Sequence, residues 1–285
     1  MSGALGAGVD RARLELRMLL RSPRELWAQI LGMVVVVVVA GRLADQAAPG
    51  GSVPMAWYVV SGFVAASLFF AGMLNVPQMV VAERDDGTVL RMRTLRGGLT
   101  AYLVGKLLFC AAVTVATVVG TLIAGTLATG MPLPSTVGDV AVLAWVVLLG
   151  FTAVTLLGAA IGTVLPNARE GMMYALLPAG VLFAISGVMF PVTAMPAAVQ
   201  AVADAFPLKW MAQGIRAALL PDAALARQGT DGWQLPVVAA VLAAWCAVGA
   251  LLAPLMLRRM ARRESGSRLS ARREAAEQKA AVVGR

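Results

Sequence analysis

The side chains that most often perform catalysis or bind metals are scarce in this 285-residue chain. It has no histidine, which removes the commonest metal ligand and general base, and it has two cysteines, Cys110 and Cys246. Each cysteine lies inside an apolar run, where packing is the usual role of an isolated thiol. We therefore predict no catalytic residue, no metal site and no cofactor bound by this chain.

One Gly-Lys sequence invites comparison with the loops that bind nucleotide phosphates. Residues 98–106 read GLTAYLVGK, but the glycine spacing differs from that of a phosphate-binding loop, and no serine or threonine follows Lys106. The chain is therefore not expected to hydrolyse ATP by itself.

Residues 83–106 form a charged island between two strongly apolar segments. They read ERDDGTVLRMRTLRGGLTAYLVGK, with an acidic cluster first and basic residues after it. Gly87 can end one helix and Thr88 can cap the next, a short Leu/Arg helix that stops at the double glycine 97–98. A short helix between two breaks is a rigid surface. This order indicates a docking element, whereas the basic residues alone are equally consistent with a solvated loop.

The composition is typical of a membrane protein, because 59% of the residues are hydrophobic and the mean hydropathy is +0.80. Windows of about 20 residues predict an all-α integral membrane fold with six transmembrane helices. The elbow and the six helices are predicted to form one domain, residues 10–257, between a flexible N-terminus (1–9) and a basic tail (258–285). The predicted spans are residues 24–43, 56–82, 101–129, 138–165, 172–190 and 235–257.

The distribution of basic residues predicts the orientation of the spans. With six spans, all but four of the 24 lysines and arginines fall on the side of the membrane that holds both termini and the charged island. Cytoplasmic loops carry such an excess, so both termini are predicted to be cytoplasmic. The four exceptions are Arg42, Lys209, Arg216 and Arg227.

An interfacial helix is predicted before the first span. In residues 10–21, leucines fall on one arc and arginines on the neighbouring arc, which suits a helix that lies at the lipid headgroups. Ser22 is the expected N-cap of the first span, with Pro23 at its first position and Glu25 closing a capping box. The chain should thus form an elbow, although a simple positive anchor is an alternative. The elbow residues are Arg13, Arg17, Arg21, Ser22 and Glu25.

The interiors of the predicted spans carry no charged residue, which argues against an ion or proton pathway. Polar and helix-breaking residues gather instead in the second span, where Pro77 should kink the helix. They either shape one wall of a substrate path or serve packing between helices. The candidate path residues are Phe69, Phe70, Asn75, Gln78, Phe183 and Met189.

Residues 191–234 are too amphipathic to span the membrane. Two short helices are predicted at 196–205 and 208–220, broken at Pro207, on the external side. They either dip into the outer leaflet and return, which requires protein or a cavity beside them, or rest on the membrane surface.

Together these features resemble the membrane subunit of type-2 ABC exporters, and the resemblance covers nearly the whole chain. It rests on the elbow, on ERDDGTVLRMRTLRGGLTAYLVGKLL, and on SGVMFPVTAMPAAVQAVADAFPLKWMAQGIRAALL. The family segment often has Glu-Arg-Glu and one further residue before Gly-Thr. Here Asp85 replaces the second glutamate and has a shorter reach.

The resemblance implies a permease for an amphipathic drug, antibiotic or lipid-like substrate. It would lie in the cell membrane, pair with a second copy and contact membrane lipids, and a separate ATP-binding subunit would bind ATP and Mg²⁺. No nucleic-acid partner is expected. The residues predicted to couple the permease to that subunit are Glu83, Arg84, Gly87, Thr88, Leu90, Arg91 and Leu95.

Two other functions remain open from the sequence. A membrane-embedded assembly or sensory protein would need no ATP-binding subunit, and an ion-coupled transporter would follow a proton gradient without ATP.

Overall fold

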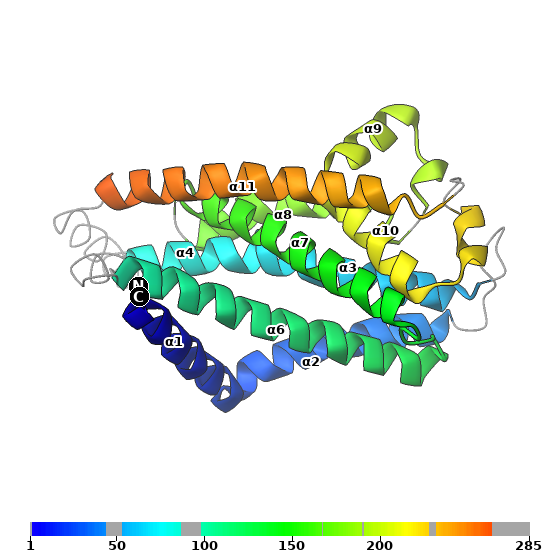
Figure 1. The fold of residues 1–285 in the computed structure, drawn as a ribbon, viewed down its shortest axis with the longest axis horizontal. Coiled ribbons are helices and arrows are strands. Elements are labelled where there is room, and N and C mark those ends of the chain that lie inside the picture. The colour runs from blue at the N-terminus through cyan, green and yellow to red at the C-terminus, as the bar shows by residue number, and fades with distance from the viewer. Residues whose placement is uncertain are drawn as a thin grey trace, which may run out of the picture.

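The computed structural model describes residues 2–43, 53–86, 98–166, 168–189, 191–227 and 232–263. Within these ranges the chain is all-α, as predicted, and its long helices run side by side in one elongated bundle (Figure 1). We call the end where α4 stops, α6 starts and α11 stops the junction end. The opposite end holds α9 and α10 and is called the far end.

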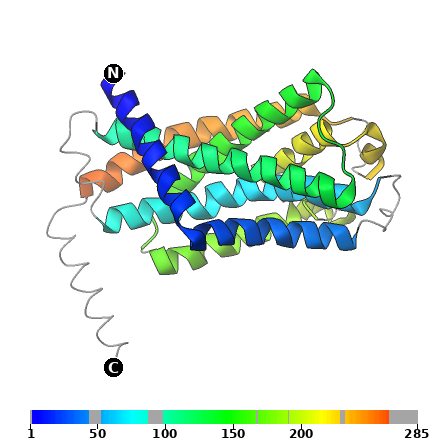
Figure 2. The ribbon, with the colours of Figure 1, turned by 90° about the horizontal axis from the view of Figure 1, so that it is seen from below.

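The elbow is formed by α1 (Ser2–Arg21) and α2 (Pro23–Arg42). Helix α1 starts at Ser2, well before the predicted start at Asp10. Residues 2–9, which were predicted to belong to a flexible N-terminus, are therefore helical. Between the two helices Ser22 is extended and Pro23 begins α2, as expected, but the Ser22 side chain makes no capping hydrogen bond to the described turn. The two helices meet at a sharp angle, and α1 crosses the junction end of the bundle (Figure 2).

The second predicted span is one long helix with a local change of winding. It consists of α3 (Met55–Phe70), a π-helical turn η1 (Ala71–Asn75) and α4 (Val76–Asp85). Pro77 lies in the first turn of α4 and has no N–H to continue the α-helical hydrogen-bond ladder, so the wider π-turn lies where the proline interrupts it.

The remaining long helices are α6 (Gly98–Thr129), α7 (Val137–Gly162), α8 (Ala168–Ile185) and α11 (Leu235–Arg263). A helix therefore lies at each of the six predicted spans. In the part of the chain that the structure describes, four are long and apolar enough to cross a membrane: Met55–Asp85, Val104–Thr129, Val137–Gly162 and Leu235–Met260. Shorter apolar helical stretches lie at Ile30–Arg42 and Gly171–Ile185.

Glycines bring α7 into backbone contact with the second span. A Cβ at Gly158 of α7 would lie 1.9 Å from the carbonyl oxygen of Gly72 in the π-turn, and one at Gly162 would lie 2.9 Å from the Cα of Pro77. Helix α7 therefore packs directly against the irregular part of the second span.

The segment at the far end forms two helices, but they differ in environment. They are α9 (Ala197–Ala205) and α10 (Pro207–Leu219), flanked by the 3₁₀ turns η2 (Val192–Ala194) and η3 (Asp222–Arg227). Pro207 starts α10 rather than separating two patterns. Helix α10 packs against α3, α7 and α11, and its Leu208, Met211 and Ile215 are fully buried. Helix α9 stands at the edge of the bundle (Figure 1).

Candidate functional site

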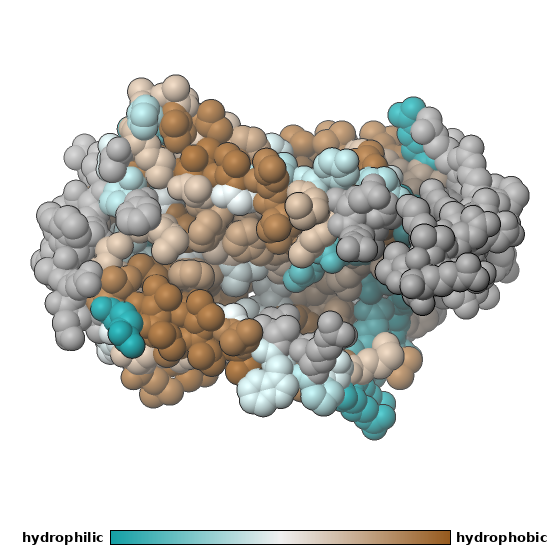
Figure 3. Space-filling model, turned by 180° about the vertical axis from the view of Figure 1, so that it is seen from behind, coloured by the Kyte–Doolittle hydropathy of each residue, from teal (hydrophilic) through white to brown (hydrophobic). Residues whose placement is uncertain are grey.

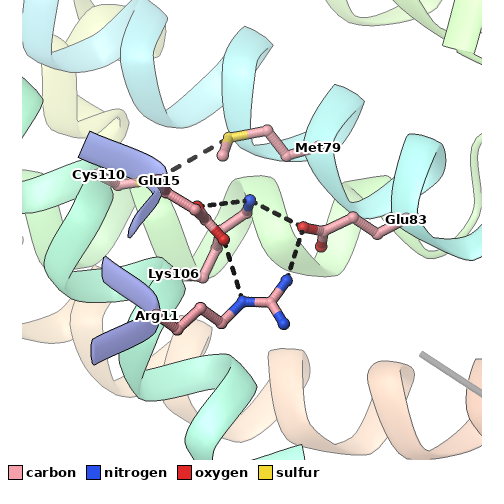
Figure 4. Close-up of polar contacts among 6 residues, drawn as sticks. All are labelled: Arg11, Glu15, Met79, Glu83, Lys106 and Cys110. Atoms are coloured by element: carbon pink, nitrogen blue, oxygen red, sulfur yellow. Dashed lines mark hydrogen bonds and ion pairs between the residues drawn. The ribbon is translucent and has the colours of Figure 1, made fainter. Parts of the chain in front are cut away.

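Four charged side chains meet at the junction end of the bundle, and we call them the charge junction. Lys106 Nζ lies 2.8 Å from Glu83 Oε1 and 3.1 Å from Glu15 Oε2. Arg11 Nε lies 3.0 Å from Glu15 Oε1, and Arg11 Nη2 lies 3.6 Å from Glu83 Oε1. Two cations and two carboxylates thus alternate around a ring (Figure 4).

The charge junction joins three helices that are distant in sequence. Arg11 and Glu15 come from α1 with the i, i+4 spacing that places them on one face, Glu83 comes from the last turn of α4, and Lys106 comes from α6. Glycines bring α1 and α6 close together here. A Cβ at Gly105 would lie 2.9 Å from the carbonyl oxygen of Gly8, and one at Gly8 would lie 2.8 Å from Val104 Cγ1.

Partial burial makes this network more than a set of surface ion pairs. The two glutamates are 12% and 14% exposed, Lys106 19% and Arg11 24%. Removal of one partner from such a network leaves a poorly solvated charge behind, which is destabilising even where the intact network adds little. The charge junction therefore favours one arrangement of α1, α4 and α6.

Arg84 points away from the charge junction and toward the connection between α7 and α8. It is 5% exposed, and it donates from Nη1 to the Leu165 carbonyl and from Nη2 to the Pro166 carbonyl, both at 2.8 Å. Its Nε lies 3.1 Å from Asp85 Oδ1. Glu83 and Arg84 were both predicted to couple the permease to the ATP-binding subunit, and they make different contacts. Glu83 contacts Arg11 of α1, whereas Arg84 holds the α7–α8 connection.

The other predicted coupling residues are Gly87, Thr88, Leu90, Arg91 and Leu95, and they lie outside the described residues. The structure does describe both flanks of this segment, since α4 ends at Asp85 and α6 begins at Gly98. Each flanking helix contributes a charge to the charge junction.

The predicted elbow arginines lie on an exposed face of α1. Arg13, Arg17 and Arg21 are all exposed, and Arg13 Nη1 lies 3.5 Å from Asp10 Oδ1. The side chain of Glu25 lies outside the part of the chain that the structure describes. The packed face of α1 instead carries Gly8, Arg11 and Glu15, which the sequence analysis did not select.

Three of the six candidate path residues lie around one cavity or its aromatic wall. Phe70 packs against Phe183 of α8 with ring centroids 5.4 Å apart, and Phe63 lies 6.4 Å from the same ring. Phe70 and Asn75 line a cavity of about 270 Å³ between α2, the α3–η1 helix and α6. The α6 wall of this cavity was not predicted from the sequence, and it is formed by Val113, Thr114, Thr117 and Thr121.

The other path residues lie elsewhere. Phe69 is 1% exposed and packs in the core beside Phe70, and Met189 is half-buried against the same core. The Gln78 side-chain amide contacts Met172 Sδ on α8. These contacts support packing roles for all three.

A second cavity, of about 370 Å³, lies at the far end beside α9 and α10. Its lining includes Asp204, Lys209 and the buried Arg216, whose Nη2 donates to the carbonyl oxygens of Gly187 at 3.0 Å and Val188 at 2.9 Å. The Arg216 guanidinium also lies 3.5 Å from the centroid of the Tyr58 ring. Arg216 thereby fixes the segment after α8 to α10 and α3.

Comparison with known proteins agrees with this architecture. A protein-family model described as "ABC-2 type transporter" matches residues 12–220, from the elbow through α10. Among curated proteins, none matches the chain. The matched region covers most of the chain and includes α4, α6 and the second half of α1, with Glu15 but not Arg11 of the charge junction. Together with its apolar helices, the match shows that this is a membrane protein and that the chain belongs to the ABC-2 type transporter family.

Proposed function

We propose that the chain is the permease subunit of an ATP-driven exporter that moves an amphipathic drug, antibiotic or lipid-like molecule out of the cell. Family membership supports an ABC ATP-binding subunit as its partner. In the proposed assembly this subunit binds ATP and Mg²⁺ and docks on residues 87–97. Both termini then lie in the cytoplasm, and α2 and α8 complete six spans of the cell membrane.

The charge junction is the observation that best supports the proposed coupling role. The docking segment connects α4 to α6, and each of these helices places a charge in the junction, as does α1. A displacement of residues 87–97 would therefore act on α4, α6 and the elbow together. The Arg84 contacts extend the same displacement to the connection between α7 and α8.

A second copy is proposed to pack on the face formed by α2 and α8. Figure 3 shows this face, where apolar side chains cover much of the surface on both sides of a hollow. Leu31 on α2 and Met173 and Leu177 on α8 are 63%, 70% and 72% exposed. Such apolar surface suits either lipid or a partner helix, and a homodimer would enclose the hollow between two subunits.

The docking residues provide the test. The affinity-tagged full chain, purified from its native membrane, should bring an ATP-binding subunit with it, and the complex should hydrolyse ATP. Leu90→Asp or Arg91→Glu should lower both recovery and hydrolysis, because each change places an unfavourable charge on the docking surface. Arg42→Glu is the matched charge control, because Arg42 is the last residue of α2 and lies outside the proposed docking segment. Unchanged recovery and hydrolysis in both docking variants would contradict the proposal.

A further inference from the structure

We propose that the cavity between α2, η1 and α6 binds a neutral, partly aromatic amphipathic molecule with a hydrogen-bonding group. This inference rests on the proposed export function and names the class of substrate. The cavity lies close to the bilayer midplane, because its lining residues Gly32, Phe70 and Thr117 each lie near the middle of a long helix.

Two threonines in the cavity wall offer hydroxyl groups to a polar group of the ligand. Thr114 and Thr121 line the cavity and are 5% and 4% exposed as whole residues, and neither Oγ1 is among the described polar atoms that are both fully buried and without a hydrogen-bond partner. Thr117, which lies between them, has a hydrogen-bond partner within its own helix, since its Oγ1 donates to the Val113 carbonyl at 2.9 Å. A hydroxyl that a ligand encloses at this depth is costly unless it gains a hydrogen-bond partner, so a ligand with an acceptor or donor would be favoured over a purely apolar one.

The rest of the lining favours an aromatic and uncharged ligand. Phe63 and Phe70 form one wall and Met33 lies on α2, a combination that suits a flat ring. No described lining residue is acidic or basic, so a charged ligand would lose its hydration without gaining an ion pair. The far-end cavity differs, since Asp204 and Lys209 line it. A lining without charged residues therefore distinguishes the midplane cavity from the far-end cavity.

A matched pair of dyes tests whether the cavity prefers a neutral ligand to a charged one. N-phenyl-1-naphthylamine is neutral, and 1-anilinonaphthalene-8-sulfonate is the same scaffold with a sulfonate. The purified full chain, in phosphatidylcholine nanodiscs without any ATPase, should show saturable fluorescence with the neutral dye. The anionic dye should show at least tenfold weaker cavity-dependent binding, and equal cavity-dependent binding of both dyes would overturn the selectivity.

A glycine pair on α2 tests the location. A Cβ at Gly32 meets nothing within 4 Å, so the leucine of Gly32→Leu can enter the cavity without moving the backbone. Gly41 is equally unobstructed but lies outside the cavity, so Gly41→Leu is the matched control. Gly32→Leu should abolish the saturable signal and Gly41→Leu should keep it. Equal binding by both variants would overturn the site, while the permease function would still be judged by recovery of the ATPase.

Valine replacements test the hydroxyls without changing side-chain volume much. Thr114→Val or Thr121→Val should weaken binding of the neutral dye by about two- to tenfold, the equivalent of one hydrogen bond. Thr129→Val on the same helix is the control, because its Oγ1 donates to the Gly125 carbonyl away from the cavity. Unchanged or tighter binding in both cavity variants would overturn the role of the hydroxyls.

Discussion

Lys106 shows how much a single side chain can connect in this protein. It contacts a carboxylate on α1 and another on α4, while its own backbone lies in α6. In the sequence, Lys106 was notable as the lysine of a Gly-Lys pair that does not fit a phosphate-binding loop, and as a basic residue on the predicted cytoplasmic side. Its partners became visible only once α1 was placed across α6, a contact that depends on Gly8 and Gly105. Lys106 is thus a positioning residue for three helices.

Loss of this cation should loosen the elbow. In Lys106→Met, Glu15 and Glu83 would face each other with Arg11 as the remaining cation of the charge junction, and α1 should detach more often, at a cost of about 1–3 kcal/mol. Trypsin should then cleave α1 at its arginines faster in nanodiscs. Adding Glu83→Gln should restore protection, since it removes one of the two facing charges. Arg13→Met, on the exposed face, is the control, and equal cleavage in all variants would contradict this role.

Arg216 should be important for stability. Replacement by methionine removes charge-assisted hydrogen bonds to two buried carbonyl groups and the contact with the Tyr58 ring. We expect a loss of about 2–5 kcal/mol. The loss of stability is measured by heating the protein in detergent and quantifying the surviving protein by size-exclusion chromatography. Arg42→Met on an exposed position should behave like the wild type, and equal survival of Arg216→Met would show that the buried contacts contribute little.

At the scale of helices, the sequence predicted the existence of the elements better than their ends. Apolar runs and the elbow signal located all the long helices, because length and hydrophobicity are local properties. The start of α1 was missed, since Gly6 and Gly8 weaken helix propensity while the packing of Gly8 on α6 favours the helix. The depth of α10 was left open for a similar reason. Its burial depends on gaps between α3, α7 and α11 that no single segment encodes.

Two glycines should respond oppositely to the same substitution. Gly158→Ala would place a methyl group 1.9 Å from the Gly72 carbonyl oxygen, so α7 must move away from the π-turn and the protein should lose stability. Gly180→Ala on α8 meets nothing within 4 Å and should stabilise its helix by up to about 1 kcal/mol. The midpoint temperatures in detergent should fall for the first variant and stay equal or rise for the second. The reverse order would contradict the packing.

At the scale of the whole molecule, the two ends of the bundle have different chemistry. The junction end concentrates ion pairs around the helices that flank residues 87–97, and the far end holds the buried α10 and the larger polar cavity. The family and the membrane location were predictable, because they follow from patterns spread along the chain. The cavity wall from α6 was not, because the three threonines read as ordinary residues of an apolar helix until α2 and η1 are placed beside them.

The proposed homodimer can be tested by cross-linking. With Cys110 and Cys246 replaced by alanine, Leu177→Cys on α8 should form a disulfide-linked dimer in oxidised membranes. Leu251→Cys on α11 is similarly exposed, at 67%, and should stay monomeric because α11 lies away from the proposed interface. Dimers through Leu251→Cys alone would place the second copy on another face.

The π-turn at Ala71–Asn75 also determines where the long helix can change its length. A π-turn holds one residue more than the α-helical turn it replaces, so removal of one residue there leaves the helices on both sides in their original rotation. The same deletion elsewhere in residues 55–85 would rotate everything beyond it by about 100° and draw it in by about 1.5 Å. Glu83 would then turn away from Lys106. Family members that differ by one residue in this helix should therefore place the gap at the π-turn, and alignments across it should be anchored separately at Phe70 and at Pro77.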